Sequence, residues 1–281
     1  MRRSALLAAI VLGVGCGGTD DGPRPRTFGG DRPADIHAPE TLTAGKQYPL
    51  VVVLHGYGAN GFTQYAFFGA GTLVAEDKAL VIAPDGTTSS IGKQFWNADP
   101  ACCDFDGTKP DDVGYIGSLI EEISAAYPVD KNQVYVLGHS NGGYMAYRMA
   151  CERADLIAAI GSLAGNAATT ASACNPSKPV SVLHMHGTAD DTVPFLEGNY
   201  GAVPSVTQWA THDGCGATRE PTVTLDLDTA VPGDETHGEA TAGCPSGVAV
   251  DLWTMEGSGH IPVFNGTAAP AIFDWLSAHK R

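Results

Sequence analysis

Short runs of apolar and β-branched residues recur along the chain, separated by longer amphipathic segments. The clearest run is Tyr48–His55 (YPLVVVLH), which is continuous rather than alternating and is followed by Gly56. A continuous apolar run of this length is typical of a strand buried on both faces of a parallel sheet. Similar runs predict further strands at Ala79–Ala83, Gln133–Leu137, Leu156–Ile160, Pro179–Met185 and Val248–Met255.

Helical periodicity occupies several of the segments between these runs. It predicts helices at Asp111–Tyr127, Gly142–Arg153, Val203–His212 and Pro270–Lys280. Strands that alternate with helices form βαβ units with right-handed crossovers, so the sheet should be mostly parallel with helices on both faces. We therefore expect a single α/β domain over residues 27–281, with ligands at the carboxyl ends of its strands.

The first 26 residues do not fit this pattern. Residues 1–15 combine two arginines, the apolar run Ala5–Val14 and small residues, which is the layout of an export signal. Cys16 then stands where lipoprotein signals carry the lipid-modified cysteine, although Gly13 replaces the usual leucine; ordinary cleavage with an unmodified terminus is the alternative. Residues 16–26 predict a flexible tether. The chain contains no apolar run of about eighteen residues, so no membrane-spanning helix is predicted.

The charge balance limits the classes of partner. The chain has a formal net charge of −15, and removal of residues 1–15 takes away Arg2 and Arg3 but no acid, which leaves −17. Phosphate binding needs a basic face, so nucleic acid and an anionic membrane surface are not expected partners. Membrane contact is expected only through a lipid on Cys16.

Six cysteines remain once Cys16 is assigned to a lipid. An even number of cysteines in an exported chain favours disulfides. No CxxC or HxxxH spacing accompanies them, so a metal site is not expected. Closeness in the sequence favours three pairs: Cys151 with Cys174, Cys215 with Cys244, and the adjacent Cys102 with Cys103.

A GxSxG pattern lies where a predicted strand meets a predicted helix. The segment GHSNG around Ser140 follows QVYVL directly, and Ser140 is the only serine with glycine both two residues before and two residues after it. Glycines at these positions permit the sharp strand-to-helix turn that lifts a serine hydroxyl clear of the sheet. Ser140 is therefore the predicted nucleophile, and an incidental tight turn is the alternative.

A serine nucleophile needs a base, and the base needs a carboxylate that holds its tautomer. In α/β-hydrolases the order along the chain is serine, carboxylate, histidine. The loop after PVSVLHM supplies Asp190 at the required place in this order, between the serine and the histidine, with Asp191 as the fallback. Both carboxylates could also be turn or cap residues.

His260 is the predicted base, because it follows a convincing strand through the loop EGSG. The other histidines after Asp190 lie in less suitable places: His212, His237 and His279. Three earlier histidines end buried strands and are expected to be hydrogen-bonded structural residues: His55, His184 and His186.

The oxyanion hole should take one N–H from the residue after the nucleophile, Asn141, and another from the glycine-rich loop after an early strand, where Tyr57 is the expected donor. Aromatic side chains on strand-end loops could form a pocket for an acyl or aryl group, and packing within the loops is the equal alternative. The predicted substrate-binding aromatics are Phe95, Trp96, Phe195 and Phe264, with Tyr57 nearby.

These segments together resemble a known group of enzymes. The segments HGYGANG, FWNADPACC, DDVGYIGSLIEEI, VYVLGHSNGGYMAYRMACE, HGTADDTVPF and GSGH are similar to bacterial esterases of the polyhydroxybutyrate depolymerase type, which merge with the feruloyl and acetylxylan esterases of the first carbohydrate-esterase family. The resemblance runs from about residue 27 to the end. It implies an α/β-hydrolase fold, a triad of Ser140, Asp190 and His260, and no metal or organic cofactor.

The chain departs from that group in one motif. Ile261-Pro262 follows GSGH, where the group often has Trp-Pro, which would alter a wall of the pocket. Large polymer depolymerases also carry an extra substrate-binding domain, for which this chain has no residues, so crystalline polyester is a less suitable substrate.

The expected function is that of a serine ester hydrolase, exported to the bacterial cell envelope or the extracellular space. Its expected substrates are feruloyl or acetyl esters of plant-wall polysaccharide. Short polyester or hydroxybutyrate oligomers are the alternative substrates, and a noncatalytic carbohydrate-binding lipoprotein is the alternative from another class.

Overall fold

The computed structural model describes residues 24–100, 102–168, 171–198 and 200–281. The predicted signal 1–15, Cys16 and most of the predicted tether lie outside these residues. The last tether residues already touch the domain, since Arg24 donates to the Ala126 carbonyl at 2.8 Å and the Tyr127 hydroxyl donates to the Pro25 carbonyl at 3.0 Å.

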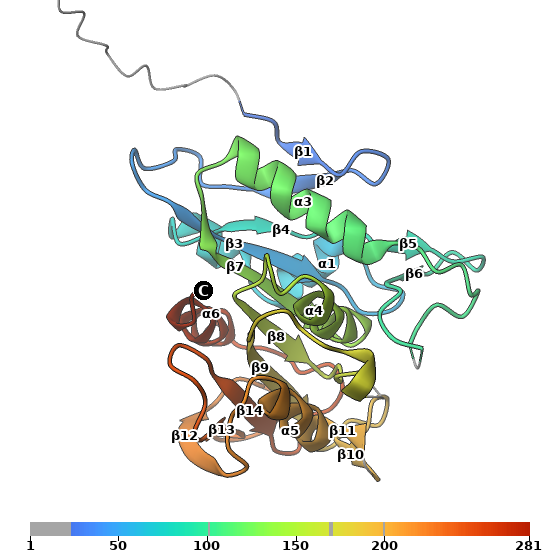
Figure 1. Cartoon of the computed structure of the whole chain (residues 1–281), viewed down its shortest axis with the longest axis vertical. Coiled ribbons are helices and arrows are strands. Elements are labelled where there is room, and N and C mark those ends of the chain that lie inside the picture. Colours follow the sequence, from blue (N-terminus) through green and yellow to red (C-terminus); the bar gives the residue numbers. More distant parts are fainter. Residues whose placement is uncertain (1–23, 101, 169–170, 199) are drawn as a thin grey trace, which may run out of the picture.

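A ten-stranded sheet forms the centre of the molecule (Figure 1). Six neighbouring strands in the middle are parallel, and two further strands at each edge run antiparallel to their neighbours. The order across the sheet is β1 (Thr27–Phe28), β2 (Ala34–His37), β4 (Leu80–Ile82), β3 (Tyr48–Leu54), β7 (Val129–His139), β8 (Ala159–Leu163), β9 (Ser181–Gly187), β14 (Val250–Met255), β13 (Thr236–Thr241) and β12 (Arg219–Leu225).

The six parallel strands are the six strands predicted from the apolar runs. Their bounds agree within two residues except at two strands: β7 begins four residues before the start predicted at Gln133, and β8 begins three residues after the start predicted at Leu156. The N–H groups of Leu156 and Ile157 donate to the Arg153 carbonyl at 2.9 and 3.2 Å, so these residues form a turn after the preceding helix. The strand then continues through Gly161 and Ser162, which interrupt the apolar run in the sequence.

The four antiparallel edge strands were not predicted. β12 is largely exposed and contains Pro221, which a strand tolerates at a sheet edge because it cannot donate to the ladder. Because these strands bury little surface, their sequences lack a continuous apolar run. Two short hairpins lie outside the main sheet: β5 (Thr87–Thr88) with β6 (Gln94–Phe95), and β10 (Leu196–Glu197) with β11 (Tyr200–Gly201).

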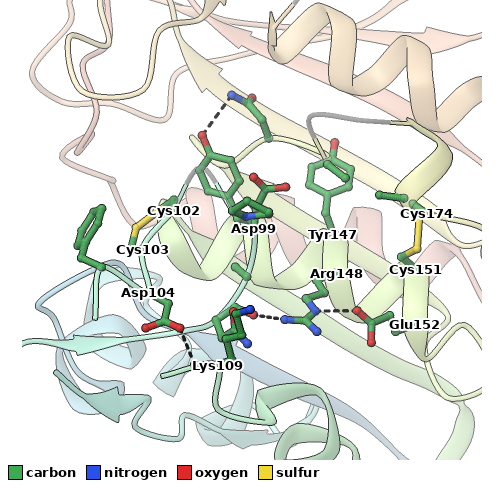
Figure 2. A pocket seen from close by; sticks show the side chains of 18 of the residues that line it. Asp99, Cys102, Cys103, Asp104, Lys109, Tyr147, Arg148, Cys151, Glu152 and Cys174 are labelled. Atoms are coloured by element: carbon green, nitrogen blue, oxygen red, sulfur yellow. Dashed lines mark hydrogen bonds and ion pairs between the residues drawn. A yellow bond between two sulfur atoms is a disulfide. The ribbon is translucent and has the colours of Figure 1, made fainter. Parts of the chain in front are cut away.

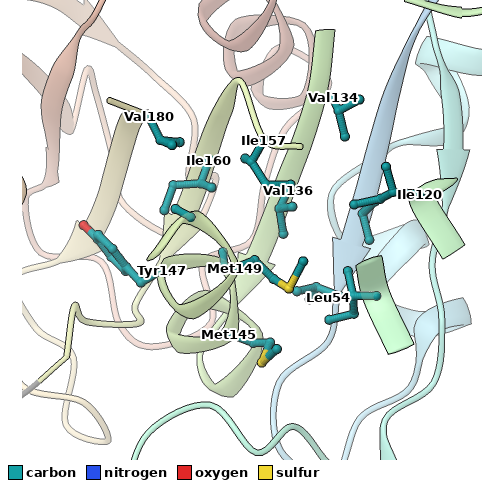
Figure 3. Close-up of a cluster of buried hydrophobic side chains, with 14 of the residues drawn as sticks. Leu54, Ile120, Val134, Val136, Met145, Tyr147, Met149, Ile157, Ile160 and Val180 are labelled. Atoms are coloured by element: carbon teal, nitrogen blue, oxygen red, sulfur yellow. The ribbon is translucent and has the colours of Figure 1, made fainter. Parts of the chain in front are cut away.

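Helices cover both faces of the sheet. Alternate residues of β3 enter two separate cores: Leu50, Val52 and Leu54 face one, and Val51 and Val53 face the other. The first core also holds side chains from α3, α4 and α5, and the second holds side chains from α2 and α6 (Figure 3 shows part of the first). The helices are α1 (Gly61–Phe67), α2 (Gly71–Ala75), α3 (Asp112–Ala126), α4 (Asn141–Glu152), α5 (Ala202–His212) and α6 (Ala268–Ala278), with a 3₁₀ turn at Ala171–Ala173.

The four longer helices confirm the four predicted ones, while α1 and α2 were not predicted. Both are short: they have seven and five residues, less than the length at which an apolar period becomes distinct. Within the described ranges, no helix has the length and apolar character needed to cross a bilayer.

The structure has disulfides between the three pairs of cysteines that closeness in the sequence favours. Cys151–Cys174 and Cys215–Cys244 join positions 23 and 29 residues apart, whereas Cys102 and Cys103 are adjacent. A crosslink restricts the unfolded chain more when it closes a longer loop. The two long-range disulfides should therefore carry nearly all of the crosslink stabilisation.

We expect the double substitution Cys215→Ser/Cys244→Ser to lower the free energy of unfolding by about 3 kcal/mol, as loop closure predicts for a loop of this size. The matched substitution Cys102→Ser/Cys103→Ser should cost much less. Urea unfolding followed by circular dichroism measures both. Equal losses from the two pairs would contradict the loop-closure account.

Asp213 is a buried carboxyl at the carboxyl end of α5, where it is 3% exposed. Its Oδ1 accepts from the Val180 N–H at 3.4 Å, and its Oδ2 has no partner among the described residues. Burial raises the pKa of Asp213 to about 7, against a smaller lowering by the Val180 N–H and the nearby Trp209 side chain. A negative charge is also unfavourable at a helix C-terminus.

This raised pKa predicts a definite pH dependence of stability. Between about pH 4 and pH 7 the folded state keeps the Asp213 proton that the unfolded chain has lost, so this group lowers the free energy of unfolding as the pH rises through that window. Asp213→Asn cannot ionise, so we expect the variant to gain stability over the natural protein from pH 4 to pH 7 and to keep that gain above pH 7. Urea midpoints at pH 4.5 and pH 8 measure the gain; an equal difference at both values would refute the assignment.

Candidate active site

Ser140 stands between the last residue of β7 and the first residue of α4. Its backbone has φ 54° and ψ −121°, a left-handed conformation that is rare for a residue other than glycine. The flanking glycines are required by close contacts: a Cβ on Gly138 would lie 2.0 Å from the Gly142 carbonyl oxygen, and one on Gly142 would lie 2.2 Å from the Leu54 carbonyl oxygen. The predicted strand-to-helix turn is present, and it presents the serine at the carboxyl edge of the sheet.

The structure brings Ser140, His260 and Asp190 into one hydrogen-bonded chain. His260 Nε2 lies 2.9 Å from Ser140 Oγ, and His260 Nδ1 lies 2.7 Å from Asp190 Oδ2. Ser140 follows β7, Asp190 follows β9 and His260 follows β14, so all three come from loops at the carboxyl ends of parallel strands. The fallback Asp191 is exposed, and its carboxylate accepts from the Thr192 hydroxyl at 3.3 Å rather than from a histidine.

Asp190 is buried, yet several donors favour its ionised form. Its Oδ1 accepts from the Thr192 and Val193 N–H groups at 2.9 and 2.8 Å. Burial by itself would raise the pKa of Asp190, but the hydrogen bonds from His186, His260, Val193 and Thr192 outweigh it and hold the pKa well below the usual range. The carboxylate therefore stays charged at neutral pH.

Two backbone N–H groups near the serine, those of Asn141 and Tyr57, lack a hydrogen-bond acceptor among the described residues. The N–H of Asn141 belongs to the first helical residue, which has no acceptor within its own helix. In the loop after β3, the N–H groups of Gly56, Gly58 and Ala59 donate to oxygen atoms of Gln64, Gln94 and Gly56 respectively. The Tyr57 N–H of this stretch has no acceptor among the described residues, which keeps it available for a ligand.

Phe95 and Trp96 are core residues, which corrects their prediction as substrate-binding side chains. They are 1% and 0% exposed. The Trp96 backbone exchanges two hydrogen bonds of 2.7 and 2.9 Å with the Asn141 side-chain amide, and its indole N–H donates to the His55 carbonyl at 3.0 Å. These contacts turn both rings inward, where they support the helix start next to Ser140.

The other two predicted aromatics are half-buried. Phe195 lies edge-on to the His186 ring with centroids 5.7 Å apart, and Phe264 packs against Phe67 at 5.3 Å. Neither lines the cavity described below. Their role in binding a substrate stays a prediction.

A cavity of about 530 Å³ lies along α4, between this helix and the segment 97–109 (Figure 2). Ser140, Asp190 and His260 are not among the residues that line it. Tyr144, Tyr147 and Arg148 of α4 line it, and two disulfides, Cys102–Cys103 and Cys151–Cys174, lie on its opposite sides. The exposed Phe105 ring at this cavity lies edge-on to Tyr57 at 5.3 Å, which connects the cavity to the glycine-rich loop.

Asn166 is a cavity residue that sequence reasoning missed. It is 1% exposed, its Nδ2 lies 3.5 Å from the Tyr144 hydroxyl, and its Oδ1 has no hydrogen-bond partner in the described part of the chain. The tyrosines could have been found by helical spacing, because Tyr144 lies one turn after Ser140. Asn166 could have been predicted as a site residue if the end of β8 had been placed correctly, because ligands bind at the carboxyl ends of parallel strands.

The three histidines expected to be structural are buried and hydrogen-bonded: His55, His184 and His186. His55 accepts from the Gly86 N–H at 2.9 Å and donates to the Gly56 carbonyl at 2.8 Å, while His184 and His186 are 0% exposed and hydrogen-bonded. Burial lowers the pKa of His55 and His184, so both are neutral at pH 7. Over the described ranges, no group of three or more His, Cys, Asp or Glu side chains is placed to hold a metal ion.

Comparison with known proteins gives relatives among esterases. Feruloyl esterase B of Piromyces equi is 29% identical over 239 residues, which cover 80% of this chain and 42% of that protein. A probable feruloyl esterase C of Aspergillus flavus is 27% identical over 233 residues, which cover 76% of this chain and 78% of that protein. The chain spans less than half the length of several of the curated relatives it matches.

Solved structures show the same fold. The acetyl xylan esterase from Aspergillus awamori has a TM-score of 0.64 at 19% identity, over 88% of this chain and 94% of that one. A thermostable esterase has a TM-score of 0.58 at 18% identity, over 91% of this chain and 62% of that one. The α/β-hydrolase fold and its single domain, both predicted from the sequence, are confirmed by this likeness and by the central sheet.

The family comparison covers the serine, its turn and most of the cavity. The model of the phospholipase/carboxylesterase family matches residues 41–209, which include Ser140, Asn166 and Asp190. This match extends over more than half of the chain and includes five of the six parallel strands, while β14 and His260 lie after it. The chain therefore belongs to the phospholipase/carboxylesterase family of α/β-hydrolases.

Proposed function

We propose that this protein is a serine carboxylic ester hydrolase in which Ser140 is the nucleophile, His260 the general base and Asp190 the residue that orients the base. The observation that carries the proposal is the continuous chain Ser140 Oγ to His260 Nε2 at 2.9 Å and His260 Nδ1 to Asp190 Oδ2 at 2.7 Å. Both distances are within hydrogen-bond reach, which proton transfer to and from the serine requires.

The first half of the reaction forms an acyl-enzyme. Because Asp190 is ionised and can only accept, His260 keeps its proton on Nδ1 and presents a free Nε2 lone pair to the serine. Ser140 Oγ attacks the ester carbonyl carbon as His260 Nε2 takes the serine proton. The N–H groups of Asn141 and Tyr57 are the proposed donors to the oxyanion. His260 then gives the proton to the leaving alcohol oxygen, and the carbon–oxygen ester bond breaks.

The second half repeats these steps with water. His260 Nε2 removes a proton from the water that attacks the acyl carbon, and the same two N–H groups receive the second oxyanion. Return of the proton to Ser140 Oγ breaks the acyl–serine bond and releases the carboxylic acid. The cycle consumes one ester and one water and leaves the enzyme unchanged.

Feruloyl or acetyl esters of plant-wall polysaccharide are the proposed substrates. Two curated relatives bear the name feruloyl esterase, and a structural neighbour is an acetyl xylan esterase. The cavity along α4, which Tyr144 lines one helical turn after Ser140, suits an aromatic or sugar ring with hydroxyl groups, since aromatic side chains line it and Asn166 Oδ1 lacks a donor among the described residues. Export through the signal at residues 1–15, followed by lipid attachment at Cys16 or by release, would place the enzyme where such esters occur.

We expect Ser140→Ala to abolish turnover of p-nitrophenyl acetate and Asp190→Asn to lower kcat about 10⁴-fold, because a neutral amide no longer fixes the base tautomer. Asp191→Asn is the matched control: its carboxylate is adjacent in sequence but exposed, and its kcat should equal that of the natural protein. Initial rates at pH 7.5 measure all three. Retained activity in Ser140→Ala, or an equal loss in both aspartate variants, would refute the assignment.

The proposed substrate class predicts a ranking among esters. Release of ferulate from methyl ferulate and from a feruloylated sugar should have a higher kcat/KM than release of hydroxybutyrate from a short hydroxybutyrate oligomer, because the cavity offers aromatic walls and an unpaired acceptor. Chromatography of the released acids measures each rate, with Ser140→Ala as the blank. Preference for the oligomer would reverse the ranking in favour of a polyester depolymerase, and failure on every ester would favour a noncatalytic carbohydrate-binding protein.

A further inference from the structure

A second hydrogen-bonded chain leads to Asp190 through residues to which the proposed mechanism gives no role. The Tyr147 hydroxyl lies 2.9 Å from His184 Nδ1, and His184 Nε2 lies 3.2 Å from His186 Nδ1. His186 Nε2 lies 2.8 Å from the Val193 carbonyl oxygen and 3.3 Å from Asp190 Oδ2. Tyr147 is 2% exposed, and both histidines are 0% exposed.

The Val193 carbonyl fixes the direction of every bond in this chain when the His186 ring is neutral. The Val193 carbonyl can only accept, so His186 Nε2 carries a proton and, in a neutral ring, His186 Nδ1 accepts. His184 Nε2 therefore donates to His186, and His184 Nδ1 accepts from the Tyr147 hydroxyl. Each donor points toward the next residue, and the last one, His186 Nε2–H, is shared between the Val193 carbonyl and the Asp190 carboxylate.

This arrangement connects the two elements that carry the proposed nucleophile and the proposed carboxylate. Tyr147 lies seven residues after Ser140 on α4, two turns along the same helix face. His184 and His186 are two residues apart on β9, so their rings lie on the same face of the sheet and stack with centroids 5.4 Å apart. The loop that holds Asp190 and Val193 begins directly after β9.

We propose that Tyr147, His184 and His186 form a buried positioning relay for Asp190. The relay supplies a second donor to Oδ2, the oxygen that receives His260 Nδ1–H, while Oδ1 is held by the Thr192 and Val193 N–H groups. With donors on both oxygens the carboxylate cannot rotate away from His260 without losing a buried hydrogen bond. This inference rests on the proposed triad and assigns it three further residues, which act through Asp190.

The relay makes a kinetic prediction that simple packing does not. A misplaced carboxylate weakens the step in which His260 gains a proton, so removal of the relay should lower kcat and leave KM unchanged. We expect His186→Leu to lower kcat about 100-fold, the size of effect that a small misplacement of a catalytic group produces. His186→Gln, whose amide N–H can replace the ring Nε2–H, should recover at least about tenfold of that loss.

Tyr147→Phe removes only the hydroxyl at the far end of the relay and keeps the ring in the core. Alone it should lower kcat about threefold to tenfold, because His184 Nδ1 loses its donor. Placed in the His186→Leu background it should have no further effect, since the relay is already interrupted there. His237→Gln, on an exposed position of β13, is the control histidine variant and should retain full kcat.

These variants and one spectroscopic measurement test the relay together. Turnover of p-nitrophenyl acetate gives kcat and KM, thermal melting shows that each variant is folded, and ¹⁵N NMR of the histidine rings in the natural full chain gives the tautomers. We expect His184 and His186 both to be neutral with the proton on Nε2. A proton on His184 Nδ1 would overturn the relay, and so would a change in KM with kcat preserved. Losses of kcat that multiply when Tyr147→Phe is combined with His186→Leu would overturn it as well.

The same experiment separates this inference from the proposed function. If the natural protein and Ser140→Ala are equally inactive, the proposed function fails, while the NMR tautomers still report whether the directional chain exists. If the natural protein is active but His186→Leu and His186→Gln turn over at the natural rate, the triad stands and the relay is refuted.

Discussion

The close approach of α4 to the sheet is the constraint on which the rest of the site depends. The backbone of α4 begins so near β3 and β7 that Gly138 and Gly142 have no room for a side chain, and Ser140 between them takes a conformation that few L-residues adopt. Packing of Met145, Tyr147 and Met149 against Val136 and Ile160 keeps the helix at that distance. The core thus determines where the serine hydroxyl lies, and the loops after β9 and β14 only have to reach it.

Burial next to this helix start accounts for several features that would otherwise look unrelated. Asn141 uses its side chain to hold the Trp96 backbone, so an aromatic residue that could have faced a ligand instead supports the proposed oxyanion site. Asp190 is equally enclosed, but it remains ionised because donors surround both of its oxygens. Asp213 is the opposite case, a buried carboxyl with one long hydrogen bond, and its pKa rises accordingly.

The sequence was most informative where burial is complete. All six parallel strands could be predicted, because a continuous apolar run as short as Tyr48–Leu54 is typical of a strand covered on both faces. Ser140, Asp190 and His260 could be chosen as site residues, because the carboxyl ends of those strands meet at one edge of the sheet. The edge strands could not be predicted, because a strand near the edge of the sheet is partly exposed and needs no continuous apolar run. The largely exposed β12 is an example. The direction of an aromatic ring, as at Trp96, depends on contacts with residues far away in the chain.

The parallel strands also set an order in which the site becomes complete during synthesis. β14 is the last parallel strand in the sequence, and it pairs with β9 near the middle of the finished sheet. A growing chain that has produced Ser140 and Asp190 still lacks His260, whose loop follows β14. Under the proposed mechanism, ester hydrolysis therefore cannot begin until almost the whole polypeptide has been made.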